Sequence, residues 1–392
     1  MPTPAAPTSP GFWRCLKCGT PNPGTLYITA CIACGYPRPP AGFEERPDAA
    51  SRPAAVRHGR VPSPGLLVAV AAYGLVLLSV FLVQCGIGQS WWPGLVLSLS
   101  PRSVFLVPLV PLAVWAWRAK RPAIAAVIAV EAFFVAGPMM GFVVPWSRLT
   151  ARADGPRVRI MTFNGGGARG IETSDFLRYL ERQKIDVVCF QEMSRDALLD
   201  KVLKERGWMS DRSGAIASRF PIVEDYPRST QINEADWHYT AVLYRVRVRG
   251  PEGREFVVSC LHMPTARYAL KRLREFDPSS IAPYVRWWGT EFVRMFELFG
   301  ELGDLPVLIG GDFNSGPDAS ELAAVRDSGQ FQSAFDAAGL GWGYTRPASF
   351  PWARIDHILA SPAWTVTSCW VGPSFGSDHK SLIADVFLSA KP

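Results

Sequence analysis

An uncharged, mostly apolar run from Gly65 to Val83 constrains this chain more than any other feature. Its length is close to the ~20 residues that a helix needs to cross a bilayer, so we expect a transmembrane helix here. Two further apolar runs follow, from Ser103 to Trp117 with two prolines and from Ala123 to Trp146 with one acid. The sequence thus predicts about three transmembrane helices within residues 65–147, and whether the second run spans fully stays open.

Clustered cations set the expected orientation of these helices. One cluster precedes the first helix and the other separates the second and third runs: Arg46, Arg52, Arg57 and Arg60, then Arg118, Lys120 and Arg121. Loops rich in Lys and Arg stay in the cytoplasm. With three crossings, the N-terminus is cytoplasmic and everything after Trp146 is extracytoplasmic. If the second run only dips into the bilayer, the C-terminal region faces inward instead.

The two halves of the chain differ in charge. Residues 1–150 contain 12 Lys and Arg against 4 Asp and Glu, whereas the remainder contains 29 against 30. A nuclease that grips a duplex non-specifically usually needs a basic face, and a balanced C-terminal half offers at most a local one. Nucleic acid is therefore the less favoured partner.

Four of the eight cysteines form two Cys-x₂-Cys pairs, Cys15 with Cys18 and Cys31 with Cys34. Four thiolates at this spacing can surround a structural Zn²⁺ tetrahedrally. Two disulfides are the alternative, although disulfides are rare in a reducing cytosol. We expect a small zinc module over residues 1–40, followed by a linker over residues 41–64 that is rich in Pro, Ala and Arg.

Together with Trp13 and Asn22, the two cysteine pairs resemble the Ran-binding-protein type of zinc finger. Eight residues separate Asn22 from Cys31, more than in that family, so a generic zinc ribbon knuckle stays open. Members of that family bind RNA or ubiquitin-like partners. Here the resemblance implies only an unidentified cytosolic partner.

The pattern changes after Pro156 to short β-rich runs that alternate with charged helical segments. The runs expected to be strands are Arg157–Phe163, Asp186–Phe190, Tyr239–Val248, Glu255–Leu261 and Pro306–Ile309. This alternation is typical of an α+β domain, which we place at residues 156–392.

Polar residues recur where these runs end. They are Asn164, then Gln191 and Glu192, then His262, then Asp312 and Asn314, and two later segments add Asp356, Asp378 and His379. Each alone has a simpler interpretation, as a surface acid or a turn residue. Strand ends, however, direct side chains into one crevice, so the joint pattern favours a catalytic site.

In this order, the motifs Asn, Gln-Glu, Leu-His, Gly-Asp-Phe-Asn, Arg-Ile-Asp and Ser-Asp-His resemble the endonuclease/exonuclease/phosphatase superfamily, and the chain is similar to its membrane-anchored bacterial members, which are associated with the cell envelope. The resemblance implies a four-layer α/β/β/α sandwich. It also implies a phosphoesterase that depends on Mg²⁺ or Mn²⁺, hard cations that prefer oxygen ligands.

The resemblance assigns a role to each polar residue. Glu192 and Asn164 would hold the metal ion against a phosphate oxygen, with Asp378 at the edge of the metal site. Asp312 would orient or deprotonate the attacking water, and Asn314 would steady that water and the phosphate.

Two histidines complete the implied set. His262 would stabilise a phosphate oxygen, and His379 would act as general base or transition-state donor. Asp356 would fix the tautomer of the His379 ring. The neighbouring His357 should point to the opposite face of its strand and pack structurally.

Between His262 and Asp312 lies a helical stretch, Ala266 to Leu302, with a basic start and an apolar stripe. Such a stripe usually packs on a sheet, but its tryptophans and cations could instead meet lipid headgroups beside the active site.

The sequence leaves three functions open: a phosphoesterase acting on a lipid-linked or envelope substrate, a membrane-tethered nuclease, and a zinc-finger adaptor without catalysis. The first is favoured.

Overall fold

A computed structural model describes residues 12–15, 17–18, 20–23, 29–38, 64–86, 92–146, 153–166, 173–193, 197–230 and 241–389. The chain divides into two compact units, residues 1–61 and residues 62–392. Nearly all of the expected linker over residues 41–64 lies outside the described residues.

The first unit contains a short antiparallel pair, β1 (Phe12–Arg14) and β2 (Pro21–Pro23). Trp13 lies opposite Asn22 in this pair. β1 precedes the first two clustered cysteines, and β2 lies between the first two and the last two.

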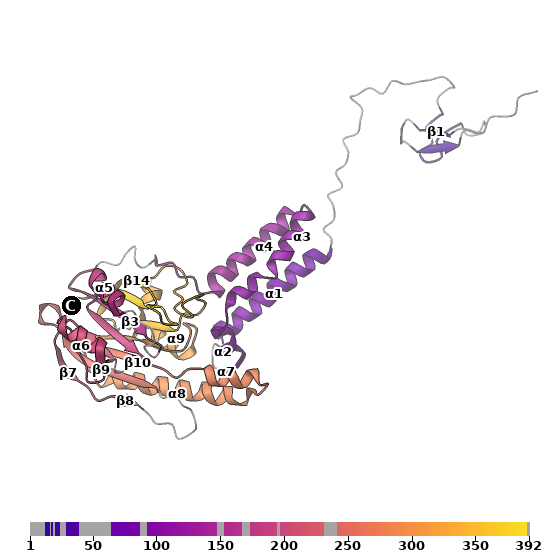
Figure 1. The fold of residues 1–392 in the computed structure, drawn as a ribbon. Coiled ribbons are helices and arrows are strands. Elements are labelled where there is room, and N and C mark those ends of the chain that lie inside the picture. The colour runs from indigo at the N-terminus through magenta and orange to yellow at the C-terminus, as the bar shows by residue number, and fades with distance from the viewer. Residues whose placement is uncertain are drawn as a thin grey trace, which may run out of the picture. The chain divides into compact units, whose positions relative to one another are not determined.

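Apolar helices open the second unit (Figure 1). Two of them are long and apolar enough to cross a membrane: α1 (Pro64–Gly86), and α4 (Pro122–Phe134) with its continuation η3 (Val135–Met139). Between them lie α2 (Trp92–Leu99), η2 (Arg102–Leu106) and α3 (Leu109–Arg118). This middle segment bends by 91° between Leu99 and Arg102. The second apolar run is therefore part of a sharply bent pair rather than a straight helix.

The apolar helices pack on one another through a few buried side chains. Leu66 and Val70 of α1 meet Ile124 and Ile128 of α4. Large apolar side chains on the outer faces stay exposed, among them Phe133 at 75%. An exposed apolar exterior around a narrow packed seam is what a bilayer-facing bundle requires.

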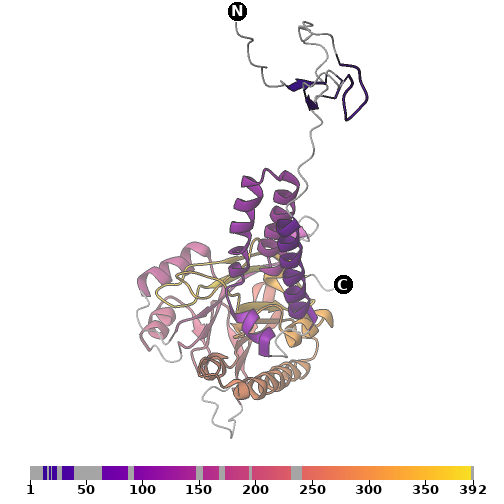
Figure 2. The ribbon, with the colours of Figure 1, turned by 90° about the vertical axis from the view of Figure 1, so that its right-hand side faces the viewer.

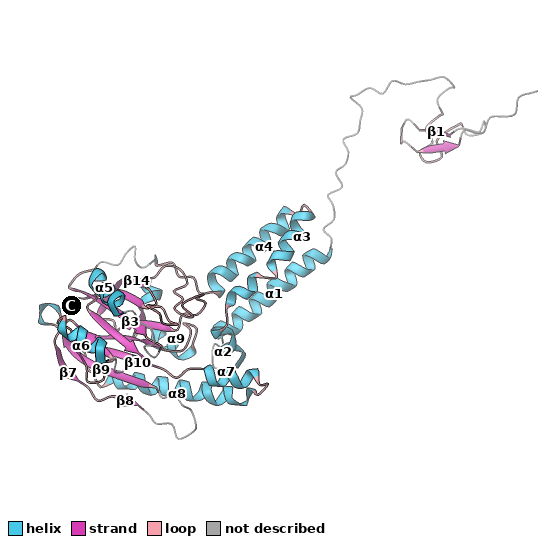
Figure 3. Cartoon of the chain, in the orientation of Figure 1, coloured by secondary structure: helices cyan, strands magenta, loops and turns pink. Residues whose placement is uncertain are grey.

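Two mixed β-sheets form the rest of the unit (Figure 3). The first sheet has the order β14-β15-β3-β4-β6-β5. Its strands are Trp364–Val371, Leu382–Leu388, Arg157–Asn164, Val187–Gln191, Ile216–Ser218 and Met209–Ser210.

The second sheet has the order β12-β13-β11-β10-β9-β7, and β8 also pairs with β9. Its strands, in that order and ending with β8, are Gln332–Ser333, Asp356–Ala360, Val307–Asp312, Glu255–His262, Val242–Arg249, Ile222–Asp225 and Ser229–Thr230.

Alternating side chains place each sheet between two apolar layers, because successive residues of a strand point to opposite faces. In β3, Ile160 faces the core between the sheets, whereas Met161 and Phe163 face outward. In β10, Val258 faces that same inner core and Val257 the outer one.

Helices cover both outer faces (Figure 2). Helices α5 (Thr173–Gln183) and α6 (Ala197–Glu205) pack on the first sheet. Helices α7 (Arg267–Arg274), α8 (Ile281–Gly300) and α9 (Ser320–Asp327) lie on the second. Helix α10 (Ala334–Ala338) contacts β14 and β13. The result is an α+β fold with two packed mixed sheets.

The apolar stripe of α8 packs on the second sheet. Trp288, Phe292 and Met295 are buried there, with Trp288 4% exposed. Because Trp288 is covered, the structural interpretation of this stripe is correct, and the idea that Trp288 meets lipid is wrong.

The apolar helices are joined to the sandwich by polar contacts. The Arg102 guanidinium lies 2.7 Å from the Asp318 carboxylate and donates to the Met139 carbonyl at 2.9 Å. Ser98 hydrogen-bonds the same Asp318 carboxylate. Just after η3, the Tyr344 hydroxyl of the sandwich donates to the Met140 carbonyl at 2.8 Å. These contacts hold the end of the helical segment that carries Ser98 and Arg102 against the sandwich.

Candidate active site

Most of the predicted polar residues occupy strand ends, within the strands rather than beyond them. Asn164 ends β3, His262 ends β10 and Asp312 ends β11, whereas Asp356 begins β13. On the second sheet, Asp312 is paired in register with His262 on one side and with Asp356 on the other. The ladder thus sets three of the predicted site residues next to one another.

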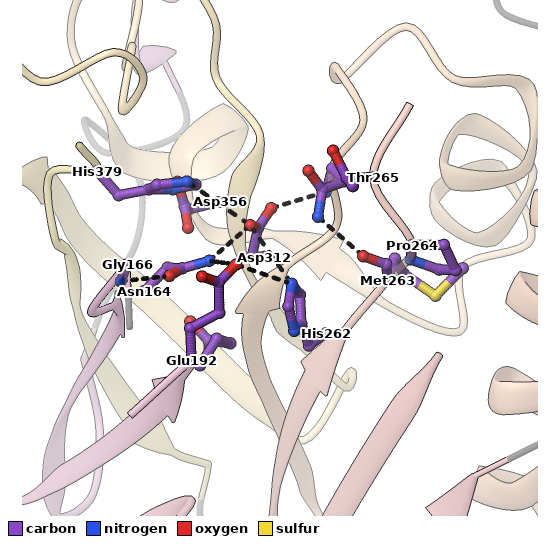
Figure 4. Close-up of polar contacts among 12 residues, drawn as sticks. Asn164, Gly166, Glu192, His262, Met263, Pro264, Thr265, Asp312, Asp356 and His379 are labelled. Carbon is purple, nitrogen blue, oxygen red and sulfur yellow. Dashed lines mark hydrogen bonds and ion pairs between the residues drawn. The ribbon is translucent and has the colours of Figure 1, made fainter. Parts of the chain in front are cut away.

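Asp312 is the centre of the cluster (Figure 4). It is 1% exposed, and its Oδ2 accepts a hydrogen bond from Asn164 Nδ2 at 2.9 Å. Its Oδ1 accepts one from the Asn314 backbone N–H at 2.8 Å. The Nε2 atoms of His262 and His379 lie 3.9 and 3.8 Å from Oδ2. Two sheets and two loops therefore converge on one carboxylate.

Two site residues sit in the left-handed backbone region, Glu192 at φ 54° and Asn314 at φ 49°. Residues other than glycine avoid this region, and such strain concentrates at functional sites. The turn directs Glu192 Oε1 to within 3.2 Å of Asn164 Nδ2 and 3.7 Å of His262 Nε2. Asn314 Nδ2 donates to the Met263 carbonyl at 2.8 Å, which fixes its amide.

His379 is held from two directions. Its Nδ1 lies 2.9 Å from Asp356 Oδ2, and both side chains are almost fully buried. Its backbone N–H donates to the Ser377 hydroxyl, which in turn donates to the Asn164 carbonyl. Burial lowers the pKa of His379, but Asp356 and Asp312 outweigh it and raise that pKa to about 9. Nε2 is left facing Asp312.

Two carboxylates lie close together in this cluster. Burial, followed by the charge of Asp356, raises the pKa of Asp312, and the two histidines only partly oppose this. The Oδ1 atom of Asp356 has no hydrogen-bond partner among the described residues. The site is thus rich in anionic oxygen, a condition that a bound cation relieves.

Two groups of side chains could hold a metal ion: Glu192 with His262 and Asp312, and Asp312 with Asp356 and His379. Within each group the ligand atoms lie within 4.8 Å of one another. Their carboxylate and imidazole atoms fit a divalent ion. Asp378 is placed differently: it is 52% exposed, and its carboxylate lies 2.9 Å from the Arg346 guanidinium at the rim.

A cavity of about 420 Å³ opens over the cluster. Glu192, His262, Asp312, Asn314, Asp378 and His379 line it, together with Arg228, Thr265, Arg267 and Arg346. The sequence did not single out Arg228, Thr265 or Arg346 as site residues. They lie outside the six motifs, and no local pattern marks them.

His357 points away from the cavity, as its neighbouring position on β13 predicts. It is 2% exposed, its Nε2 lies 3.0 Å from the Ser315 carbonyl, and its ring meets Phe313 edge-on. Burial, followed by the charge of Arg354, lowers its pKa to about 4. His357 is therefore a neutral packing residue near pH 7.

The four clustered cysteines form a second candidate metal site in the first unit. Their sulfur atoms lie within 4.8 Å of one another. Cys15 Sγ is 3.6 Å from Cys34 Sγ, and Cys18 Sγ is 3.5 Å from Cys31 Sγ. All four are free thiols, and these separations exceed the ~2.05 Å of a disulfide. The buried Asn22 contacts Cys31 Sγ through Nδ2 and accepts from the Ile32 N–H, bracing the site.

Comparisons with solved structures find similar proteins at low sequence identity. An endonuclease/exonuclease/phosphatase from Bacteroides vulgatus is 15% identical and covers 60% of this chain and 100% of its own, with a TM-score of 0.48. A mannosyl-6-phosphatase from Bacteroides thetaiotaomicron is 18% identical, at 59% and 100% coverage and a TM-score of 0.45. The human Nocturnin catalytic domain with bound sulfate is 19% identical, at 62% and 99% coverage and a TM-score of 0.43.

No curated protein matches the chain. The model of the Endonuclease/Exonuclease/phosphatase family, however, matches residues 161–379, more than half of the chain. The matched range contains Asn164, Glu192, Asp312 and His379. On this match, the chain belongs to the Endonuclease/Exonuclease/phosphatase family.

Proposed function

We propose that this chain is a membrane-anchored, divalent-metal-dependent phosphoesterase that hydrolyses a phosphate ester of a lipid-linked or envelope substrate. One observation carries the proposal: Glu192, His262, Asp312 and His379 line one cavity although they are far apart in sequence, and Asn164 hydrogen-bonds Asp312 beside it. Family membership supports hydrolysis of a phosphoester.

A divalent ion, Mg²⁺ or Mn²⁺, would be held by Glu192 with Asn164, and Asp378 would bound the site at its rim. Asp312 lies beside Glu192 through their shared partner Asn164 and could also approach the ion. When bound, the ion supplies positive charge at a phosphate oxygen, which a phosphoester anion needs before a nucleophile can approach.

The residues of the chain orient water and phosphate. Asp312 accepts a hydrogen bond from the water and directs it at phosphorus, while Asn314 steadies both. His262, whose side chain is 26% exposed, donates to a phosphate oxygen as charge builds up there. A bond forms between the water oxygen and phosphorus, the ester P–O bond breaks, and the leaving oxygen takes up a proton.

His379 acts at the same centre as general base or as transition-state donor. The Asp356 carboxylate accepts a hydrogen bond from the Nδ1–H of His379, so the tautomer is fixed and Nε2 is presented to the reacting atoms. Ser377 locks the backbone beside that ring.

Membrane anchoring rests on the apolar helices α1 and α4 and on the bent pair between them. Arg118, Lys120 and Arg121 lie at the turn between α3 and α4, at the opposite end of these helices from Met139 and Met140, which meet the sandwich. By the positive-inside tendency, this turn is cytoplasmic and the catalytic domain extracytoplasmic.

For the first unit we propose a structural Zn²⁺ held by Cys15, Cys18, Cys31 and Cys34. Hydrogen bonding with the Thr20 side chain lowers the pKa of Cys18 to about 6, which favours the thiolate that binds metal. The module would bind a cytosolic partner.

The proposal is tested by assaying the full chain in neutral-lipid nanodiscs with and without Mg²⁺. Substrates are 4-nitrophenyl phosphate, bis(4-nitrophenyl) phosphate, dioctanoyl phosphatidic acid and plasmid DNA, and Asp312→Ala is the control. We expect metal-dependent release of phosphate or alcohol that Asp312→Ala abolishes. Faster release of nucleotides from DNA would favour the nuclease, and no metal-dependent hydrolysis of any substrate would favour the adaptor.

A further inference from the structure

A second hollow adjoins the catalytic cavity. It lies between α7, Leu99 at the end of α2, and the segment from Arg346 to Ile355, and we call it the α7 groove. Thr265, Arg267, Asn314, Arg346 and Asp378 line both the groove and the cavity. The two spaces are therefore continuous, and a molecule with its phosphate at Asp312 can extend into the groove.

One wall of the α7 groove is cationic. Arg267, Lys271 and Arg274 recur at helical spacing, so they share one face of α7, and all three are exposed. None of them forms an ion pair with any residue that the structure describes. By contrast, Arg272 on the same helix pairs with Asp277. Three adjacent cations without anionic partners form a site for an anionic ligand.

The opposite wall is apolar and includes the helical segment that we propose to enter the membrane. Leu99 and Trp352 line it, and Leu270 of α7 adds an apolar side chain to the groove. Trp352 Nε1 donates to the Leu99 carbonyl at 3.3 Å, which ties this wall to α2. Two exposed aromatic side chains lie nearby in the chain: Phe276, 95% exposed just beyond α7, and Phe350, 68% exposed beside the Trp352 ring.

A ligand that satisfies both walls carries negative charge next to an apolar chain. We infer that the α7 groove binds the second anionic group and the first chain carbons of an amphiphilic substrate whose terminal phosphate lies in the catalytic cavity. This inference rests on the proposed function for the identity of the cavity. The inference deepens that function, because a groove with a second anionic subsite selects lipids with two anionic groups over lipids with one.

The contact with α2 gives the reason for a lipid occupant rather than a nucleic acid strand. A strand would use the cations of α7 but would leave the exposed parts of Leu99 and Leu270 without further apolar cover. A lipid would use both walls, and it would reach the cavity from beside α2 without leaving the bilayer entirely.

Binding can be measured separately from hydrolysis by removing divalent metal with EDTA. The probe is dioctanoyl phosphatidylglycerol phosphate, which has a terminal and an internal phosphate. Dioctanoyl phosphatidic acid has the same chains and one phosphate. Kd values are measured on the full chain in neutral-lipid nanodiscs, with empty nanodiscs as background.

We expect Lys271→Ala to weaken binding of the two-phosphate lipid roughly tenfold, and Lys271→Ala with Arg274→Ala roughly a hundredfold. Phosphatidic acid should lose less than threefold in the same variants, by the same reasoning. Lys201→Ala, an exposed helical lysine on α6, is the matched control and should change neither Kd. The dibutanoyl form of the two-phosphate lipid should bind at least tenfold more weakly than the dioctanoyl form, because less apolar surface is buried.

Equal Kd values for the wild type and the double variant would overturn the groove as an anionic subsite. Two results together would overturn a lipid as the occupant of the groove in favour of nucleic acid. They are equal Kd values for the dibutanoyl and dioctanoyl lipids, and tighter binding of an oligonucleotide that is lost in Lys271→Ala. Since EDTA removes catalysis, these outcomes are distinct from a failure of the proposed hydrolysis, which would show as absent turnover with Mg²⁺ while binding persists.

Discussion

The catalytic cavity and the α7 groove share a border but are built differently. The cavity uses strand ends, and its key carboxylates are buried and hydrogen-bonded, as with Asp312 to Asn164 and Asp356 to His379. The groove uses one helix and a loop, and its three α7 cations, Arg267, Lys271 and Arg274, are exposed and without ion partners among the described residues. Under the proposed function, the buried centre performs the reaction and the exposed groove selects the substrate.

The largest effect should come from the centre of the cavity. Asp312→Ala should lower kcat by about 10³-fold or more for lipid and soluble phosphoesters alike, because it removes the residue that directs the water. Steady-state assays with both substrates check this. A loss of kcat confined to the lipid substrate would contradict the proposed division of roles between the catalytic cavity and the α7 groove. Thermal unfolding should show unchanged or raised stability, since a buried acid with a raised pKa is removed.

A second test stays inside the cavity. Asp356→Asn keeps the shape but removes the charge that raises the pKa of His379, so kcat should fall roughly 100-fold. If protonated His379 is the active form, the alkaline limb of the pH–rate profile should also move to lower pH. The matched variant Asp336→Asn removes a carboxylate that pairs with Arg354 outside the cavity. It should lower Tm and spare kcat, and equal kcat losses in the two variants would count against a special role for Asp356.

A third test concerns the support behind the site. The folded-state pKa of His357 is about 4 and the unfolded value is about 6.5, so the unfolded chain binds the extra proton between these pH values. Stability should therefore fall as the pH drops from about 6.5 to 4, by about 3 kcal/mol from this residue. His357→Gln should flatten that part of the curve in denaturation measurements from pH 4 to 8. If His357→Gln keeps the wild-type dependence of stability on pH, His357 is not the source of that dependence.

The smallest effect is expected on the groove side. A double-mutant cycle on Arg102 and Asp318 should give a coupling of about 1 kcal/mol in stability. Arg102→Ala should also weaken binding of the two-phosphate lipid a few-fold, because α2 is displaced. Turnover of 4-nitrophenyl phosphate should stay unchanged. The exposed pair Arg178 and Asp175 is the control and should show almost no coupling. Equal losses with the two-phosphate lipid and with 4-nitrophenyl phosphate would show that the catalytic cavity and the α7 groove act as one region rather than two.

Local sequence patterns predicted five of the strands, β3, β4, β9, β10 and β11, and most of the residues that now meet at the cavity. Alternation sorts Ile160 from Met161 without knowledge of tertiary structure. The boundaries were less accurate: β3, β10 and β11 include Asn164, His262 and Asp312, which were expected to follow their strands. A polar residue at the last ladder position breaks the apolar run although the backbone pairing continues.

Features that depend on distant partners left no local signal. Arg346 reaches Asp378 from a loop, and Arg102 meets Asp318 across 216 residues of chain. Whether the second apolar run spans fully was left open because of its prolines, and the 91° bend lies just before that run, between Leu99 and Arg102. The left-handed turns at Glu192 and Asn314 are likewise imposed by the packed strands around them.

The close packing of β11 against its neighbours constrains how this site can change. A Cβ on Gly310 would lie 3.1 Å from Cys189 Sγ of the first sheet, and one on Gly311 would lie 2.1 Å from the Leu261 carbonyl oxygen of β10 in its own sheet. Gly310 therefore lets the two sheets approach where Asn164 meets Asp312, and Gly311 lets β10 approach β11 where His262 pairs with Asp312. Evolution of a new specificity in this scaffold would have to proceed through the loops and α7, since a side chain added at these glycines would displace the strands that carry Asp312 and its partners.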